Sequence, residues 1–191
     1  MVQAQPPKQK RTRGAYMTIS NLKSSIKDYA KDIKLNITGV LDADNSGGLS
    51  QNQVYAIALA SAYSTKQADV ITALEAEVEG KISDAEINAA KSAAAMMAMN
   101  NIYYRFVHLV SDNEYANMPA GLRMNVIANP GVEKIDFELY SLAVSAINGC
   151  GMCIDAHVNQ AVKHGVSKQA VQHTIKIGAV INAAAQALAI G

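Results

Sequence analysis

The feature that most restricts the fold of this chain is the lack of strand patterns. No segment alternates apolar and polar residues for long enough to predict a β-strand. Apolar residues instead recur with helical spacing from Thr18 onward, in a chain that is rich in alanine and only 5% aromatic. We therefore predict an all-α fold, with helices over about 20–34, 50–63, 66–78, 83–110, 135–147, 151–164 and 167–189.

Composition divides the chain near residue 17. Residues 1–16 are polar and basic without apolar periodicity, which predicts a disordered basic extension. Residues 17–191 are predicted to form one all-helical domain with two similar halves, about 18–115 and 116–191, and the active site in the second.

A weak internal repeat suggests these halves. Leu59-Ala60-Ser61-Ala62 resembles Ala143-Val144-Ser145-Ala146, an offset of about 84 residues. At that offset Lys66, Asp69 and Ala73 correspond to Cys150, Cys153 and His157, which would leave the first half without this chemistry.

Charge and hydropathy exclude several classes of protein. Seventeen basic and sixteen acidic residues give a net charge of +1, so we expect no nucleic-acid partner. The most apolar stretches, 88–99 and 175–190, are interrupted by polar residues or glycine, which argues against a membrane span. With no secretory signal pattern at the N-terminus, the expected location is the cytoplasm.

The two cysteines lie three positions apart, at Cys150 and Cys153. Asn148-Gly149 is a turn signal that lets a helix begin near Cys150, with Asn148 as a candidate cap. Cys150 would then lie in the first helical turn, where free N–H groups and the helix dipole favour a thiolate. Cys153 is close enough in such a turn for a disulfide, so a redox pair is predicted.

Two further residues could manage protons for this pair. His157 follows Cys153 by four residues and shares its helix face, so a neutral imidazole there can accept the thiol proton. Glu138 lies on the preceding predicted helix and reaches His157 if the two helices pack as a hairpin.

Alternatives remain open at this point. The cysteines could be structural, buried beside a core histidine, or His164 or His173 could complete a zinc site with Cys150, Cys153 and His157. Residues 42–53 resemble a calcium loop, in which Gln53 replaces the usual chelating glutamate. The candidate calcium ligands are Asp42, Asp44, Ser46 and Ser50.

The chain resembles the alkyl hydroperoxide reductase D family, also called alkylhydroperoxidase D, within the carboxymuconolactone-decarboxylase-like superfamily. Its motif of Glu, eleven residues, Cys-x-x-Cys-x-x-x-His appears as Glu138, Cys150, Cys153 and His157. The likeness runs from Met17 to the end and includes D-Y-A-K-D-I-K-L-N (28–36), M-N-N-I-Y-Y-R (99–105) and P-A-G-L-R-M-N-V-I-A-N-P-G (119–131).

The resemblance implies a duplicated helical bundle that assembles as a homotrimer and acts as an antioxidant dithiol–disulfide oxidoreductase. No cofactor would be bound. Electrons would pass from dihydrolipoamide on a lipoyl-bearing acyltransferase to a peroxiredoxin of the alkyl hydroperoxide reductase C type, with weak direct reduction of alkyl hydroperoxides. A carboxymuconolactone-decarboxylase-like lyase is the alternative within the superfamily, but that activity does not require a Cys-x-x-Cys pair.

The resemblance also implies a division of labour between the cysteines. Cys153 would react with peroxide, deprotonated through His157 with Glu138 behind it, and Cys150 would be the more exposed resolving sulfur. The residues alone favour Cys150 as the nucleophile, because it lies at the helix start. The chain departs from many family members at Met152, where they carry a titratable histidine.

Overall fold

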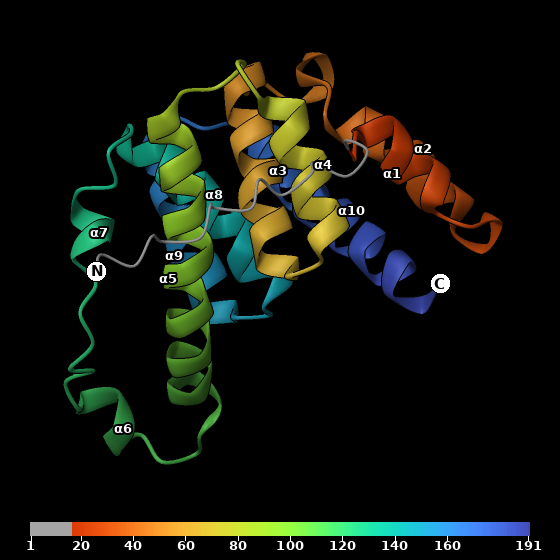
Figure 1. Cartoon of the computed structure of the whole chain (residues 1–191). Coiled ribbons are helices and arrows are strands. Elements are labelled where there is room, and N and C mark those ends of the chain that lie inside the picture. Colours follow the sequence, from red (N-terminus) through yellow and green to blue (C-terminus); the bar gives the residue numbers. More distant parts are fainter. Residues whose placement is uncertain (1–16) are drawn as a thin grey trace, which may run out of the picture.

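The computed structural model describes residues 17–191, and within that range every regular element is a helix (Figure 1). The all-α prediction is confirmed, and the extension predicted for residues 1–16 lies outside the described residues. The elements in chain order are α1 (Ile19–Ser25), the 3-10 helix η1 (Asp28–Ala30), α2 (Lys31–Val40), the 3-10 helix η2 (Ala43–Asn45), α3 (Gln51–Thr65), α4 (Ala68–Val78), α5 (Asp84–Leu109), α6 (Glu114–Asn117), α7 (Asn125–Ala128), α8 (Lys134–Ile147), α9 (Gly151–Lys163) and α10 (Lys168–Ile190).

Helix α3 is the centre of the bundle. Val54 and all residues over 56–62 are buried, so the helix is enclosed on every side. It packs against α4, α5, α8 and α10. Four of its buried side chains are alanine, which lets these neighbours approach closely.

Helix α10 closes the bundle on the side of α3 and α8. By length and composition alone it could cross a membrane, contrary to the expectation for residues 175–190. It nevertheless packs against α2, α3 and α8, and 44% of its most apolar window is buried. A helix in the core of a globular protein can have the same length and the same apolar composition.

The beginning of the chain differs from its prediction. The helix expected over 20–34 is two helices, because Ile26 and Lys27 adopt extended backbone, with ψ of 126° and 167°. The break lets Ile26, which is 1% exposed, enter a small core shared by η1, α2 and α10. Thr18 caps α1, which begins at Ile19, close to the expected start.

The segment between α5 and α8 contains two short helices, α6 and α7, that the sequence analysis did not predict. Figure 1 shows the C-terminal end of α5 and α6 extending away from the bundle. Large apolar side chains there are exposed: Ile102 by 66%, Phe106 by 47% and Leu109 by 71%.

Three helix starts follow the expected capping chemistry. Ser50 and Ser83 form capping boxes with Gln53 and Glu86, and Ser167 caps α10. These serines fix where α3, α5 and α10 begin.

Helix positions repeat along the chain. The starts of α8, α9 and α10 follow those of α3, α4 and α5 by 83, 83 and 84 residues. This supports two similar halves, which stay a prediction. The N-cap of α4 is Gln67 and that of α9 is Cys150, so the counterpart of Cys150 is Gln67 rather than Lys66.

Asp136 joins α8 to the capping box of α3. Its Oδ1 accepts a hydrogen bond of 2.7 Å from Gln53 Nε2. Burial raises the pKa of Asp136, and the hydrogen bond from Gln53 offsets this only in part. The folded state therefore holds the proton more tightly than the unfolded state, and stability falls as the pH rises from the ordinary aspartate pKa through the raised one.

We predict that Asp136→Asn is more stable than the parent at pH 7, because the amide oxygen still accepts from Gln53 while the buried charge is removed. The gain in the free energy of urea unfolding should shrink as the pH approaches about 4. The control is Asp155→Asn, at an exposed position on α9. An Asp136→Asn protein less stable than the parent at every pH would contradict this account.

Candidate active site

The two cysteines form a disulfide across the first turn of α9, with Cα atoms 5.3 Å apart. Cys150 is fully buried and Cys153 is 7% exposed. The expectation that Cys150 is the more exposed sulfur is therefore wrong. Its side chain folds inward over the helix N-terminus, whereas Cys153 lies one turn further along α9.

Cys150 is itself the N-cap of α9, and its Sγ accepts a hydrogen bond of 3.3 Å from the N–H of Cys153. Asn148, the expected cap, instead ends α8. A sulfur at this position faces a free N–H group and the positive end of the helix dipole. The site thus stabilises negative charge on Cys150 when the disulfide opens.

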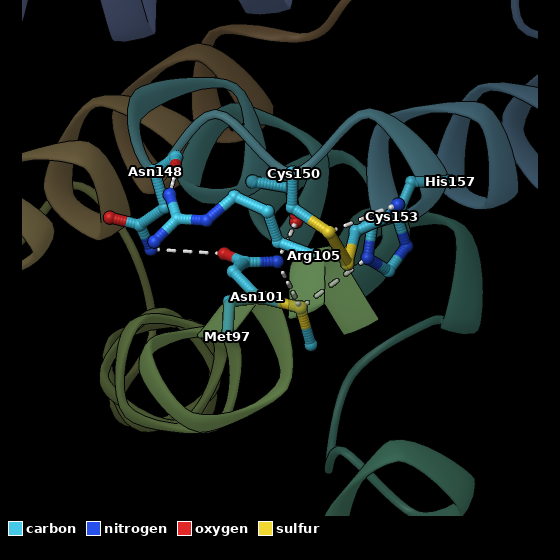
Figure 2. The surroundings of a disulfide bond; sticks show 8 residues. Met97, Asn101, Arg105, Asn148, Cys150, Cys153 and His157 are labelled. Carbon is cyan, nitrogen blue, oxygen red and sulfur yellow. Dashed lines mark hydrogen bonds between the residues drawn. A yellow bond between two sulfur atoms is a disulfide. The ribbon is translucent and has the colours of Figure 1, made fainter. Parts of the chain in front are cut away.

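Glu138 and His157 lie on adjacent helices and contact each other directly, with 2.7 Å between Glu138 Oε2 and His157 Nδ1. The two side chains are 8% and 13% exposed. The turn at Asn148-Gly149, where Gly149 has a φ of +69°, reverses the chain and brings α8 back against α9. The imidazole is four residues beyond Cys153, so it shares a face of α9 with the disulfide (Figure 2).

The second nitrogen of the imidazole faces Met97 on α5, with 3.4 Å between His157 Nε2 and Met97 Sδ. A thioether accepts hydrogen bonds but cannot donate them, so this contact needs the proton on Nε2. The contact with Glu138 then holds a second proton, on Nδ1 or on the carboxyl group. Within the described part of the chain the imidazole makes no hydrogen bond to either cysteine sulfur; the Glu138–His157 pair instead keeps a transferable proton next to the disulfide.

Helix α5 also fixes the turn that precedes Cys150 (Figure 2). Asn101, fully buried, donates to Ser145 Oγ and accepts from Asn148 Nδ2, both at 2.9 Å. Arg105 donates to the carbonyl oxygen of Asn148 at 2.6 Å. Met97, Asn101 and Arg105 follow each other at intervals of four, so one face of α5 contacts both the imidazole and the turn.

Sequence reasoning found the four motif residues but missed this support. The sequence assigned Met97 and Arg105 no part in the site. The signal was the spacing of Met97, Asn101 and Arg105, but nothing in the sequence indicated that this face of α5 would meet the turn before Cys150. Met152, between the cysteines, is 37% exposed.

Several residues considered as metal ligands form hydrogen bonds with the backbone instead. His173 Nε2 lies 3.0 Å from the Val40 carbonyl oxygen, and His164 Nδ1 lies 2.7 Å from that of Gln160. In the calcium-like loop, Ser46 is buried and exchanges hydrogen bonds with the backbone of Leu49. Among residues 17–191, no group of three or more His, Cys, Asp or Glu side chains could hold a metal ion.

Comparison with known proteins identifies close relatives over most of the chain. Alkyl hydroperoxide reductase AhpD of Coxiella burnetii is 55% identical over 168 residues, covering 88% of this chain and 95% of the relative. The proteins of the same name from Hyphomonas neptunium and Brucella abortus are 57% and 52% identical, covering 91% and 90% of this chain and 94% and 97% of the relatives. Residues 113–190, which include the motif, also match the model of the carboxymuconolactone decarboxylase family.

We predict that Asn101→Ala destabilises the protein by roughly 1–3 kcal/mol, because it leaves the buried Ser145 and the partly buried Asn148 without their partner. Urea unfolding measures the loss. Asn88→Ala, the same change at an exposed position of α5, is the matched control and should change stability little. Equal effects of the two substitutions would show that the Asn101 network contributes nothing specific.

Proposed function

The chain belongs to the alkyl hydroperoxide reductase AhpD family, and from this membership and the site geometry we propose how its enzyme works. We propose a dithiol–disulfide oxidoreductase of peroxide detoxification, in which Cys150 and Cys153 alternate between dithiol and disulfide. The observation that carries the proposal is the disulfide at the N-terminus of α9, with Cys150 Sγ accepting the N–H of Cys153 beside the Glu138–His157 pair.

Reduction of the disulfide begins at Cys153, the more exposed sulfur. A thiolate of dihydrolipoamide attacks Cys153 Sγ, and Cys150 leaves as a thiolate that the helix N-terminus stabilises. The second dihydrolipoamide thiol then attacks the mixed disulfide, which releases Cys153 and closes the lipoamide disulfide. Two electrons reach the protein, and the two thiol protons of the donor pass to His157 and the cysteines.

The reduced pair then delivers these electrons. The main acceptor is the disulfide of a peroxiredoxin, reached by the same exchange in reverse. In direct peroxide reduction, the Cys153 thiolate attacks the terminal peroxide oxygen, and the alcohol leaves with a proton from His157. Cys150 then displaces water from the Cys153 sulfenic acid and restores the disulfide.

We further propose that the enzyme is a cytoplasmic homotrimer. The exposed apolar side chains of Ile102, Phe106 and Leu109 on the free end of α5 support self-association, since such clusters mark interaction surfaces. The number of copies follows from the family resemblance. A monomer in sedimentation equilibrium would contradict the proposed assembly.

The relay is tested by offering the oxidised protein dihydrolipoamide, reduced thioredoxin or reduced glutathione, and following electron transfer to a peroxiredoxin. We expect dihydrolipoamide to support transfer and Cys150→Ser or Cys153→Ser to abolish it, because either change prevents the disulfide. Transfer that survives in either variant, or that runs only with thioredoxin or glutathione, would overturn the proposal.

We expect Glu138→Gln and His157→Gln each to lower the rate of transfer by about 10²-fold, since both remove the proton held beside the cysteines. His164→Gln, on the solvent side of the end of α9, is the control and should leave the rate unchanged. Stopped-flow measurement of disulfide reduction by dihydrolipoamide is the readout. Wild-type rates in both site variants would remove proton transfer from the mechanism.

A further inference from the structure

The sulfur of Met97 lies between two N–H groups at the active site. His157 Nε2 is 3.4 Å from Met97 Sδ, and Asn101 Nδ2 donates to the same sulfur at 3.9 Å (Figure 2). Met97 is only 1% exposed, so water barely reaches this side chain. Within residues 17–191, the thioether is the only hydrogen-bond partner of Nε2, and α5 holds it in place.

The two contacts of the imidazole fix the number of protons that His157 shares with Glu138. A thioether cannot donate, so Nε2 carries one proton, and the 2.7 Å contact between Nδ1 and Glu138 Oε2 needs another. Two protons on an imidazole and a carboxylate leave the pair electrically neutral, which suits side chains that are 13% and 8% exposed. Without an acceptor at Nε2, one proton would be enough for the contact with Glu138. Met97 therefore keeps the second proton in the site.

The imidazole holds its two protons with different strength. Nδ1 faces a carboxylate, and a hydrogen bond to a charged acceptor is about twice as strong as a neutral one. Nε2 faces a thioether, which is a weak acceptor. The proton on Nε2 is therefore the one that leaves more easily. Cys153 lies four residues before His157 on the same face of α9, so a thiolate formed there competes with Met97 for this proton.

We propose that Met97 is a positioning residue that holds the Nε2 proton of His157 until Cys153 takes it. When exchange with the donor releases Cys153 as a thiolate, the proton passes from Nε2 to Cys153 Sγ. The imidazole then regains a proton from solvent, which has taken up the proton of the donor thiol. One N–H bond breaks and one S–H bond forms, and no electrons are transferred in this step. The role rests on the proposed function, because that exchange produces the thiolate, and it adds the requirement that the acceptor at Nε2 be weak.

Two substitutions of Met97 separate the presence of an acceptor from its strength. Met97→Leu nearly conserves the volume but removes the acceptor. Met97→Gln introduces a stronger acceptor, because Asn101 and His157 both donate toward this position and so select the amide oxygen rather than the NH₂ group. The control is Met96→Leu, the same change at the adjacent position of α5, where the side chain packs against the hydrophobic core.

The first readout is nitrogen-15 NMR of the His157 ring in the oxidised protein at neutral pH, assigned with His157→Gln. We expect a protonated Nε2 in the wild type, Met96→Leu and Met97→Gln, and loss of this proton in Met97→Leu. The second readout is stopped-flow reduction of the disulfide by dihydrolipoamide. Both Met97 variants should react about tenfold more slowly than the wild type, since one lacks the proton and the other holds it too firmly. Met96→Leu should react at the wild-type rate.

Four results would overturn the proposal and leave the proposed function intact. A protonated Nε2 in Met97→Leu would show that the thioether does not hold the proton. Loss of the proton without loss of rate in Met97→Leu would show that another proton is transferred. A wild-type rate in Met97→Gln would show that the strength of the acceptor is irrelevant, and an equal loss of rate in Met96→Leu would reveal a general packing effect. If dihydrolipoamide does not reduce the wild-type disulfide, the proposed function fails as well.

Discussion

The contact of one face of α5 with the α8–α9 hairpin is the constraint on which the site depends. Met97 reaches the imidazole, Asn101 bridges Ser145 and Asn148, and Arg105 holds the Asn148 carbonyl. Within residues 17–191, the other hydrogen bonds of the turn before Cys150 join backbone groups of α8 and the turn itself. Since that turn sets where α9 begins, α5 determines both the cap at Cys150 and the direction of His157.

Burial makes the cysteine pair depend on nearby polar groups of the protein. The sulfurs of Cys150 and Cys153 and the Glu138–His157 pair are all largely shielded from solvent. A charge created there is poorly solvated by water, so the protein must supply its partner. The N–H of Cys153 serves the Cys150 thiolate, and Glu138 serves the imidazolium. A buried disulfide can therefore open without leaving an uncompensated charge.

The sequence predicted the helical class and the long helices because their caps and periodicity are local. The capping boxes at Ser50 and Ser83 and the turn at Asn148-Gly149 are such signals. The Glu138–His157 pair was also within reach, since a short turn implies a hairpin.

What the sequence did not predict depends on contacts between distant segments. The break at Ile26 places this side chain in a core that includes residues of α10. The hydrogen bonds of Asn101 and Arg105 to Ser145 and Asn148 form only because α5 packs on α8. The prediction that Cys150 is the more exposed cysteine was wrong for a local reason. The sulfur of Cys150 is itself the N-cap of α9. Cysteine is not among the preferred N-cap residues, which are Asn, Asp, Ser, Thr and Gly.

The most direct test of the account is the titration of Cys150 in the reduced Cys153→Ser variant, followed by thiolate absorbance in the ultraviolet. This variant keeps the backbone N–H that caps the sulfur and leaves one thiol to titrate. The account predicts a pKa for Cys150 below the value of about 8.5 for a free cysteine. A pKa at or above that value would show that burial outweighs the helix N-terminus, and the leaving-group role of Cys150 would be wrong.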